Sequence, residues 1–192
     1  MRSTLRTLCI GSLAIIALAG SVLPGAAAAP AGVALDFAFA GQTDPAQNHV
    51  HVVGPDDVER YGTVRLTGTT EIAGSEVAAE VIGFSLYRDG VGPFVGALTL
   101  TFPSGDAIGL RYDAVAQPDA EGTTVAGALT VIGGSGAFVE VTGQGVVTAR
   151  RSGELGSAVE YAVTLTLAGL PEGFAAAADA PAAVLARALP VR

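Results

Sequence analysis

The clearest source of chemistry in this sequence is a carboxyl group placed among apolar residues. Glu80 alternates with Ile82, Phe84 and Leu86, and residues at alternate positions of a β-strand share one face. A carboxyl group buried among such neighbours has a raised pKa and can act as an acid. The alternative is that Glu80 lies in water at the open end of the fold.

Two tyrosines occupy the same kind of position. Tyr112 alternates with Ile108 and Leu110, and Tyr161 alternates with valines within 159–163. A phenol on such a face can contact a ligand, or its hydroxyl can reach water at the rim of the fold. The predicted ligand-contacting set is Glu80, Phe84, Tyr112 and Tyr161.

The sequence gives little support for a metal site or a catalytic nucleophile. His49 and His51 share one face of a short strand, but two ligands do not make a metal site and no third is evident. We therefore expect an exposed strand there, no metal site and no cofactor. Spacing alone leaves a Ser-His-Asp triad open, and no local motif supports one. The catalytic residues are unknown, and the sequence leaves open whether the protein is an enzyme.

The first 28 residues are predicted to be a signal peptide. Arg2 and Arg6 precede an uncharged apolar stretch at 8–23, and the alanines at 26–28 form a cleavage site. The stretch is shorter than the roughly 20 residues that a membrane-spanning helix needs. We expect cleavage after Ala28 and a secreted, extracellular protein. Cys9, the only cysteine, would be removed, so the mature chain would form no disulfide.

The charge argues against two classes of partner. The formal net charge is −8, and loss of the two N-terminal arginines makes the mature chain more acidic. Nucleic acids and anionic membrane surfaces both attract basic proteins. We therefore expect no nucleic-acid partner and no membrane association after signal cleavage.

A period-two pattern runs through most of the chain. Between residues 33 and 168 apolar and polar residues alternate in segments rich in valine and threonine, separated by short turns such as Asp89-Gly90. This pattern predicts about eight antiparallel strands joined by hairpins. So long a meander closes into a barrel or folds into a sandwich, because an open sheet leaves unpaired edges. We predict an all-β domain at 29–168, one closed calycin-like antiparallel barrel.

The remaining segment, 169–192, differs in character. It is rich in alanine, and it is expected to be a tail that forms a short helix or is disordered.

A glycine-rich segment marks one corner of the predicted barrel. The sequence LTVIGGSGAF at 129–138 is followed by TGQG at 142–145. Glycines there would permit positive φ or close backbone contact, and Phe138 would anchor the turn. A phosphate-binding loop is the weaker interpretation, because Val139 replaces the third glycine of that motif and a strand rather than a helix follows.

This segment resembles the V-V-G-G-T-G-x-F-x-x-A-x-G signature of the dirigent and allene oxide cyclase-like barrels. The opening Tyr61-Gly62-Thr63-Val64 and the strand Gly83-Phe84-Ser85-Leu86-Tyr87 are also similar to that family. The likeness covers residues 33–168. The chain contains arginine but no lysine and is rich in alanine, and this composition suggests a secreted bacterial member of the family. Plant dirigents have acidic residues near the ends of two early strands. In this chain the matching positions are Gly41 and Gly68, and the nearby acidic residues Asp36 and Glu71 do not align with them.

The resemblance implies a barrel with an apolar inner cavity. A small hydrophobic ligand is then the expected partner, and the barrel would guide its cyclisation or coupling; an enzyme of this type would be a cofactor-independent cyclase, an isomerase or a dirigent-like protein. Members of such families also form homo-oligomers. The alternative is a non-catalytic exported structural or interaction barrel, whose interior is filled by its own side chains.

Overall fold

The computed structural model describes residues 32–55, 58–120, 122–152 and 157–174. These residues form an all-β fold with two short 3-10 turns, η1 (Pro45–Gln47) and η3 (Gly136–Phe138). The strands are β1 (Val33–Thr43), β2 (His49–Val53), β3 (Glu59–Ile72), β4 (Ser75–Arg88), β5 (Gly92–Thr101), β6 (Ala107–Asp119), β7 (Gly122–Gly134), β8 (Thr142–Arg151) and β9 (Val159–Ala168).

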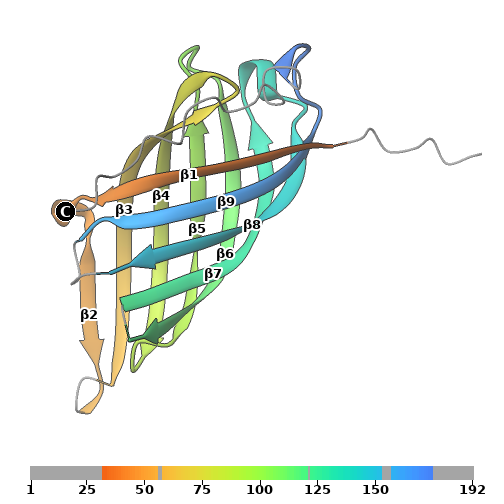
Figure 1. Cartoon of the computed structure of the whole chain (residues 1–192). Helices are drawn as coiled ribbons and strands as arrows, with labels where there is room; N and C mark the ends of the chain where they lie inside the picture. Colours follow the sequence, from red (N-terminus) through yellow and green to blue (C-terminus); the bar gives the residue numbers. More distant parts are fainter. Residues whose placement is uncertain (1–31, 56–57, 121, 153–156, 175–192) are drawn as a thin grey trace, which may run out of the picture.

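The sheet closes on itself. Its strands follow the order β1-β9-β8-β7-β6-β5-β4-β3-β2, all neighbouring pairs are antiparallel, and an additional β1–β3 pairing joins the two sides (Figure 1). Eight strands therefore form the closed ring, and β2 extends it along the edge of β3. The predicted closed antiparallel barrel of about eight strands is confirmed.

The barrel closes at a seam that requires glycine. Strand β1 pairs with β3 through Gln42↔Thr67 and Thr43↔Leu66. A Cβ atom on Gly68 would lie 2.4 Å from the backbone oxygen of Ala40, and one on Gly41 would lie 3.1 Å from Leu66. The two positions onto which the resemblance would place acidic residues are thus occupied by the glycines that let β1 approach β3.

Alternation separates the inside of the barrel from the outside. Along β9 the buried residues Tyr161, Val163, Leu165 and Leu167 alternate with exposed residues, and β1 and β6 show the same pattern. Burial of these inward aliphatic and aromatic side chains is the main stabilising contribution, at roughly 25 cal/mol per Å² of apolar surface.

The predicted glycine corner is confirmed. Strand β7 ends at Gly134, whose Cβ atom would lie 2.2 Å from the backbone oxygen of Phe138. Gly136 has a φ of 56°, in the left-handed region that favours glycine. The chain then makes the η3 turn, buries Phe138 and continues into β8 rather than into a helix.

The corner helps to fill one end of the barrel. The ring of Phe138 lies 4.4 Å from that of Phe102 and 5.6 Å from that of Phe174, between ring centroids. Next to this aromatic cluster the interior is packed with fully buried aliphatic side chains, among them Leu100 and Ile108. We call this the packed end. It lies opposite the end at which β2 pairs with β3 (Figure 1).

Two sequence predictions concern parts of the chain outside the described residues. The predicted signal peptide at 1–28 is one, and most of the predicted tail, from 175 onward, is the other. Within the described ranges no helix has the length and apolarity needed to span a membrane.

Candidate ligand-binding cavity

The barrel interior is hollow at the β2 end. A cavity of about 360 Å³ lies there, which falls within the range of roughly 300–1,000 Å³ typical of small-molecule sites. Its deep part is apolar and aromatic, with Leu66, Phe94, Tyr112 and Tyr161 among its lining residues. Small or polar side chains surround its outer part, including Ser85 and Thr123.

Small inward residues create the space, and one aromatic ring forms the floor. Position 83 on β4 is glycine, and a Cβ atom there would lie 2.1 Å from the ring of Phe94. The far end of the Phe94 ring therefore occupies the place that a side chain at position 83 would take, and the ring packs against Tyr112 with a centroid distance of 5.2 Å. Towards the mouth, β4 and β8 contribute Ser85 and Ala149 rather than the bulky residues of the packed end.

Three tyrosines surround this space. Tyr112 is 1% exposed and Tyr161 is 4% exposed, and Tyr161 stacks on Phe39 with a centroid distance of 4.6 Å. Burial raises the pKa of Tyr112, Tyr161 and Tyr87 above the ordinary value, and in Tyr87 the positive charge of Arg151 partly offsets that rise. All three phenols therefore stay protonated at neutral pH and can donate a hydrogen bond.

These raised pKa values predict a loss of stability at high pH. A tyrosine in an unfolded chain ionises near pH 10, whereas the folded barrel holds the protons of Tyr112 and Tyr161 more tightly. Above about pH 10 the folded state binds more protons than the unfolded state, so the free energy of unfolding falls as the pH rises. Urea unfolding at about pH 8 and about pH 11 measures this. Ionisation of every tyrosine in the still-folded barrel near pH 10 would contradict it.

The hydroxyl group of Tyr112 is buried without a hydrogen-bond partner in the described part of the chain. A buried polar group in that state lowers stability by about 1–3 kcal/mol. We therefore expect Tyr112→Phe to leave the free energy of unfolding unchanged or to raise it by up to about 1 kcal/mol, measured by urea unfolding without ligand. The control is Tyr61→Phe on the outer face of β3, where the half-buried phenol donates a long hydrogen bond of 3.4 Å to Glu59; it should lower the free energy of unfolding by less than about 1 kcal/mol. A loss above about 1 kcal/mol for Tyr112→Phe would show that the hydroxyl has a partner.

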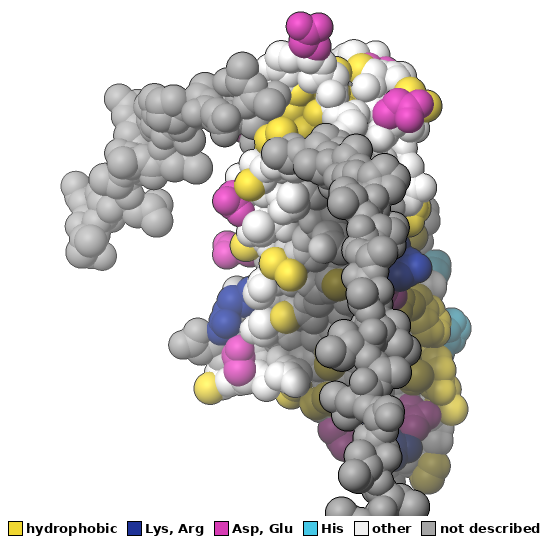
Figure 2. All heavy atoms as spheres, turned by 90° about the vertical axis from the view of Figure 1, so that its right-hand side faces the viewer, with side chains coloured by type: hydrophobic (Ala, Val, Ile, Leu, Met, Phe, Trp, Pro, Cys, Tyr) yellow, Lys and Arg dark blue, Asp and Glu magenta, His cyan; other side chains and the backbone are white. Residues whose placement is uncertain are grey.

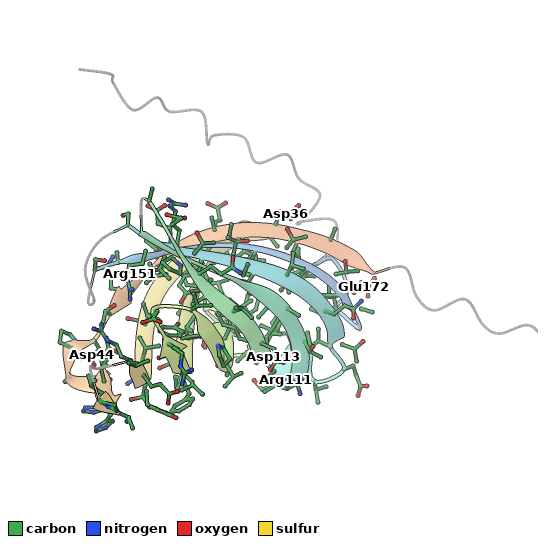
Figure 3. The ribbon with its side chains drawn as sticks, turned by 90° about the horizontal axis from the view of Figure 1, so that it is seen from below. Asp36, Asp44, Arg111, Asp113, Arg151 and Glu172 are labelled. Atoms are coloured by element: carbon green, nitrogen blue, oxygen red, sulfur yellow. The ribbon has the colours of Figure 1, made fainter. Side chains whose placement is uncertain are left out.

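Arg151 ends β8 at the mouth of the cavity. Its Nε atom is buried and has no hydrogen-bond partner, and its Nη2 atom lies 3.5 Å from the Thr123 hydroxyl oxygen. The ion pairs found within the described ranges use four other arginines, Arg65, Arg88, Arg111 and Arg150. No carboxylate is among the described residues that line the cavity. Arg151 also lies apart from Asp36, Asp44 and Asp113 in Figure 3.

The structure places the four predicted ligand-contacting residues in two different environments. Tyr112 and Tyr161 come together in the cavity. Glu80 and Phe84 lie on the outer face of β4, so their predicted inward orientation is wrong. Glu80 forms an ion pair with Arg65, and Phe84 is 43% exposed.

The cause of this error is that both faces of β4 carry apolar residues. The inward set is Val77, Ala79, Val81 and Gly83, and the outward set includes Ile82 and Phe84. The outward set is bulkier, so the pattern alone favours the wrong face. At position 83 the inward residue can only be small, because Phe94 of the neighbouring strand occupies the space above Gly83.

The outer position of Glu80 predicts a small mutational effect. Exposed ion pairs contribute about 0–1 kcal/mol, and Glu80 lies outside the cavity. We expect Glu80→Gln to change the free energy of unfolding by less than about 1 kcal/mol and to leave binding of apolar molecules unchanged. Urea unfolding and a binding titration measure the two quantities. A large loss of binding would mean that the carboxyl group reaches the ligand.

Sequence reasoning missed several cavity residues, above all Arg151 and Phe94. A signal for Arg151 was present, because it has the same parity as Val147 and Ala149 along β8, both of which are buried. Its neighbour Arg150 has the opposite parity and pairs with Asp119 on the outside.

The two histidines lie on β2, and both are exposed. Figure 2 shows them in cyan beside hydrophobic side chains, in keeping with the exposed valines Val50, Val52 and Val53 of the same strand. Among the described residues no group of three or more histidine, cysteine or acidic side chains could hold a metal ion.

Comparisons with known proteins give a limited result. No family model and no curated protein matches the chain. Among solved structures, the chain is similar to the pterocarpan synthase dirigent protein, with 14% sequence identity and a TM-score of 0.38, over 70% of this chain and 89% of that one. Membership of the dirigent and allene oxide cyclase-like family stays a prediction from the sequence.

Proposed function

We propose that this protein is a secreted barrel that binds a small hydrophobic molecule in the cavity at its β2 end. The observation that carries the proposal is the cavity of about 360 Å³, with its aromatic floor and a few polar groups around it. Such a combination of apolar walls and sparse polar groups is typical of small-molecule sites. The alternative is a structural barrel whose interior is filled by its own side chains. It predicts that the whole interior is packed in the way seen at the packed end.

Guidance of a cyclisation or coupling would follow from positioning within this cavity. No acidic side chain lines it within the described ranges, so no carboxyl group there would supply a proton to a bound molecule. The groups that would orient a bound molecule are the protonated phenols of Tyr112 and Tyr161 and the guanidinium group of Arg151. Export and homo-oligomerisation remain part of the proposal, and both rest on the sequence.

Two experiments test binding. Native mass spectrometry of the exported protein would show whether a small molecule is retained, and titration with the neutral fluorescent probe N-phenyl-naphthylamine would show whether the cavity accepts an apolar molecule. We expect saturable binding with one molecule per barrel, and competition by other apolar molecules. An unliganded mass together with no saturable probe binding would overturn the proposal.

A further inference from the structure

We propose that the ligand is an amphiphile with a carboxylate group, held by Arg151 at the mouth while its apolar part lies in the deep cavity. This inference rests on the proposed function and adds the chemical class of the ligand. It comes from the position of Arg151, from the absence of a carboxylate near it in the described ranges, and from the distribution of polar groups along the cavity.

The first argument is the unpaired charge. A guanidinium group is always ionised, and removing it from water is costly unless it is paired and hydrogen-bonded. Arg151 is partly buried, yet its Nε atom has no partner and its Nη2 atom makes one long contact with Thr123. The side chains of the four ion pairs formed elsewhere on the described surface are 31–68% exposed. Arg151 is therefore a cation with free hydrogen-bond donors at the edge of an apolar space.

The second argument is the direction in which Arg151 lies. Its strand partner is Thr123 of β7, and the inward residues that precede it on β8 are Val147 and Ala149. The side chain therefore belongs to the inner face of the barrel, and it is close enough to Tyr87 of β4 to interact with it electrostatically. The guanidinium fork matches a carboxylate in two parallel hydrogen bonds. The Tyr87 phenol faces the same space and is a further donor.

The third argument is the gradient of polarity along the cavity. Leu66, Phe94 and Val125 line the deep part, whereas Asn48, Thr123 and other small polar residues line the outer part. A molecule with one apolar end and one anionic end would match this gradient in a single orientation. Because no carboxylate lines the cavity in the described ranges, nothing there repels an anion.

The acidic net charge makes the test discriminating. A chain with a formal charge of −8 attracts cations at long range, so non-specific electrostatics would favour a cationic amphiphile. Preference for an anion would therefore report the local charge of Arg151. Decanoate, decanol and decylammonium share the same apolar chain and differ in the charge of the head group. Their affinities can be measured by displacement of N-phenyl-naphthylamine and by calorimetry.

We expect decanoate to bind at least about tenfold more tightly than decanol, and decylammonium to bind most weakly. Arg151→Gln should reduce the affinity for decanoate by at least about tenfold, to the level of decanol, and leave decanol unchanged. Arg151→Lys should retain part of the preference, because a lysine keeps the charge and loses the two-pronged geometry. Arg150→Gln is the matched control, since it changes the adjacent arginine on the outer face, and it should leave all three affinities unchanged.

The outcomes separate this inference from the proposed function. Equal binding of decanoate and decanol by the unmodified protein would overturn the inference while the cavity remains a binding site. Undiminished decanoate binding by Arg151→Gln would overturn the assignment to Arg151. Absence of binding by the neutral probe and all three amphiphiles would overturn the proposed function as well. If Arg151→Gln fails to fold, the comparison of the three amphiphiles on the unmodified protein decides the question.

Discussion

Ala149→Trp is expected to abolish the binding of apolar molecules while the barrel stays folded. Ala149 is 2% exposed and lies between Val125 and Tyr161 on the neighbouring strands, where it lines the cavity. An indole ring there would occupy the space that a ligand needs, and it would bury apolar surface of its own. Because the new ring enters an existing space rather than a packed core, the strain that usually follows overpacking should be small.

The matched control for this variant is Thr148→Trp. Thr148 precedes Ala149 on β8 and is exposed on the outer face, so the control adds the same side chain without entering the cavity. Probe titration should show at least a hundredfold weaker binding for Ala149→Trp, a loss of about 2.7 kcal/mol, because the indole ring occupies the space of the ligand, and unchanged binding for Thr148→Trp. Thermal unfolding should show that both remain folded. Undiminished binding by a folded Ala149→Trp protein would place the site elsewhere.

Phe138→Ala is expected to lower the free energy of unfolding by about 3–5 kcal/mol, the usual range for removing a buried aromatic side chain. Phe138 is 4% exposed, and its ring packs against Phe102 and Phe174. The substitution would leave a void at the packed end and release the glycine corner that Phe138 holds. The loss is a large fraction of the 5–15 kcal/mol by which domains are typically stable.

The residue that follows provides the control. Val139 is 65% exposed, and Val139→Ala should change the free energy of unfolding by less than about 0.5 kcal/mol. Urea unfolding of both variants measures the difference. At urea concentrations below its unfolding midpoint, Phe138→Ala should bind the probe as tightly as the unmodified protein, because the cavity lies at the other end of the barrel. Similar small losses for the two variants would show that Phe138 does not anchor this corner.

The sequence predicted the barrel well because most strands have one clearly apolar face. In β9 every inward position is a large apolar or aromatic residue and most outward positions are polar, so the period-two pattern leaves no ambiguity. The same clarity in β6 allowed the inward position of Tyr112 to be predicted, whereas its contact with a ligand stays a prediction. The corner around Gly136 could also be predicted, since glycine clusters within a strand pattern indicate turns or close backbone contact.

The site was predicted less well because its geometry depends on contacts between distant strands. Whether Gly83 or Phe84 faces inward depends on Phe94 of β5, which fills the space above the glycine, and no local pattern contains that information. The surroundings of Arg151 likewise depend on contacts between strands that are distant in the sequence. An arginine at a strand end is usually solvated, and its unpaired state depends on which side chains the closed barrel brings to the mouth.

The difference between the two ends of the barrel has a consequence for how one bound ligand would be exchanged for another. Phe102 and Phe138 close one end, so a molecule bound as proposed would have to leave through the opening by which it entered. A newcomer cannot push the occupant out from behind, and replacement has to wait until the cavity empties. The rate of ligand exchange would then equal the dissociation rate of the bound molecule and would not depend on the concentration of the competitor.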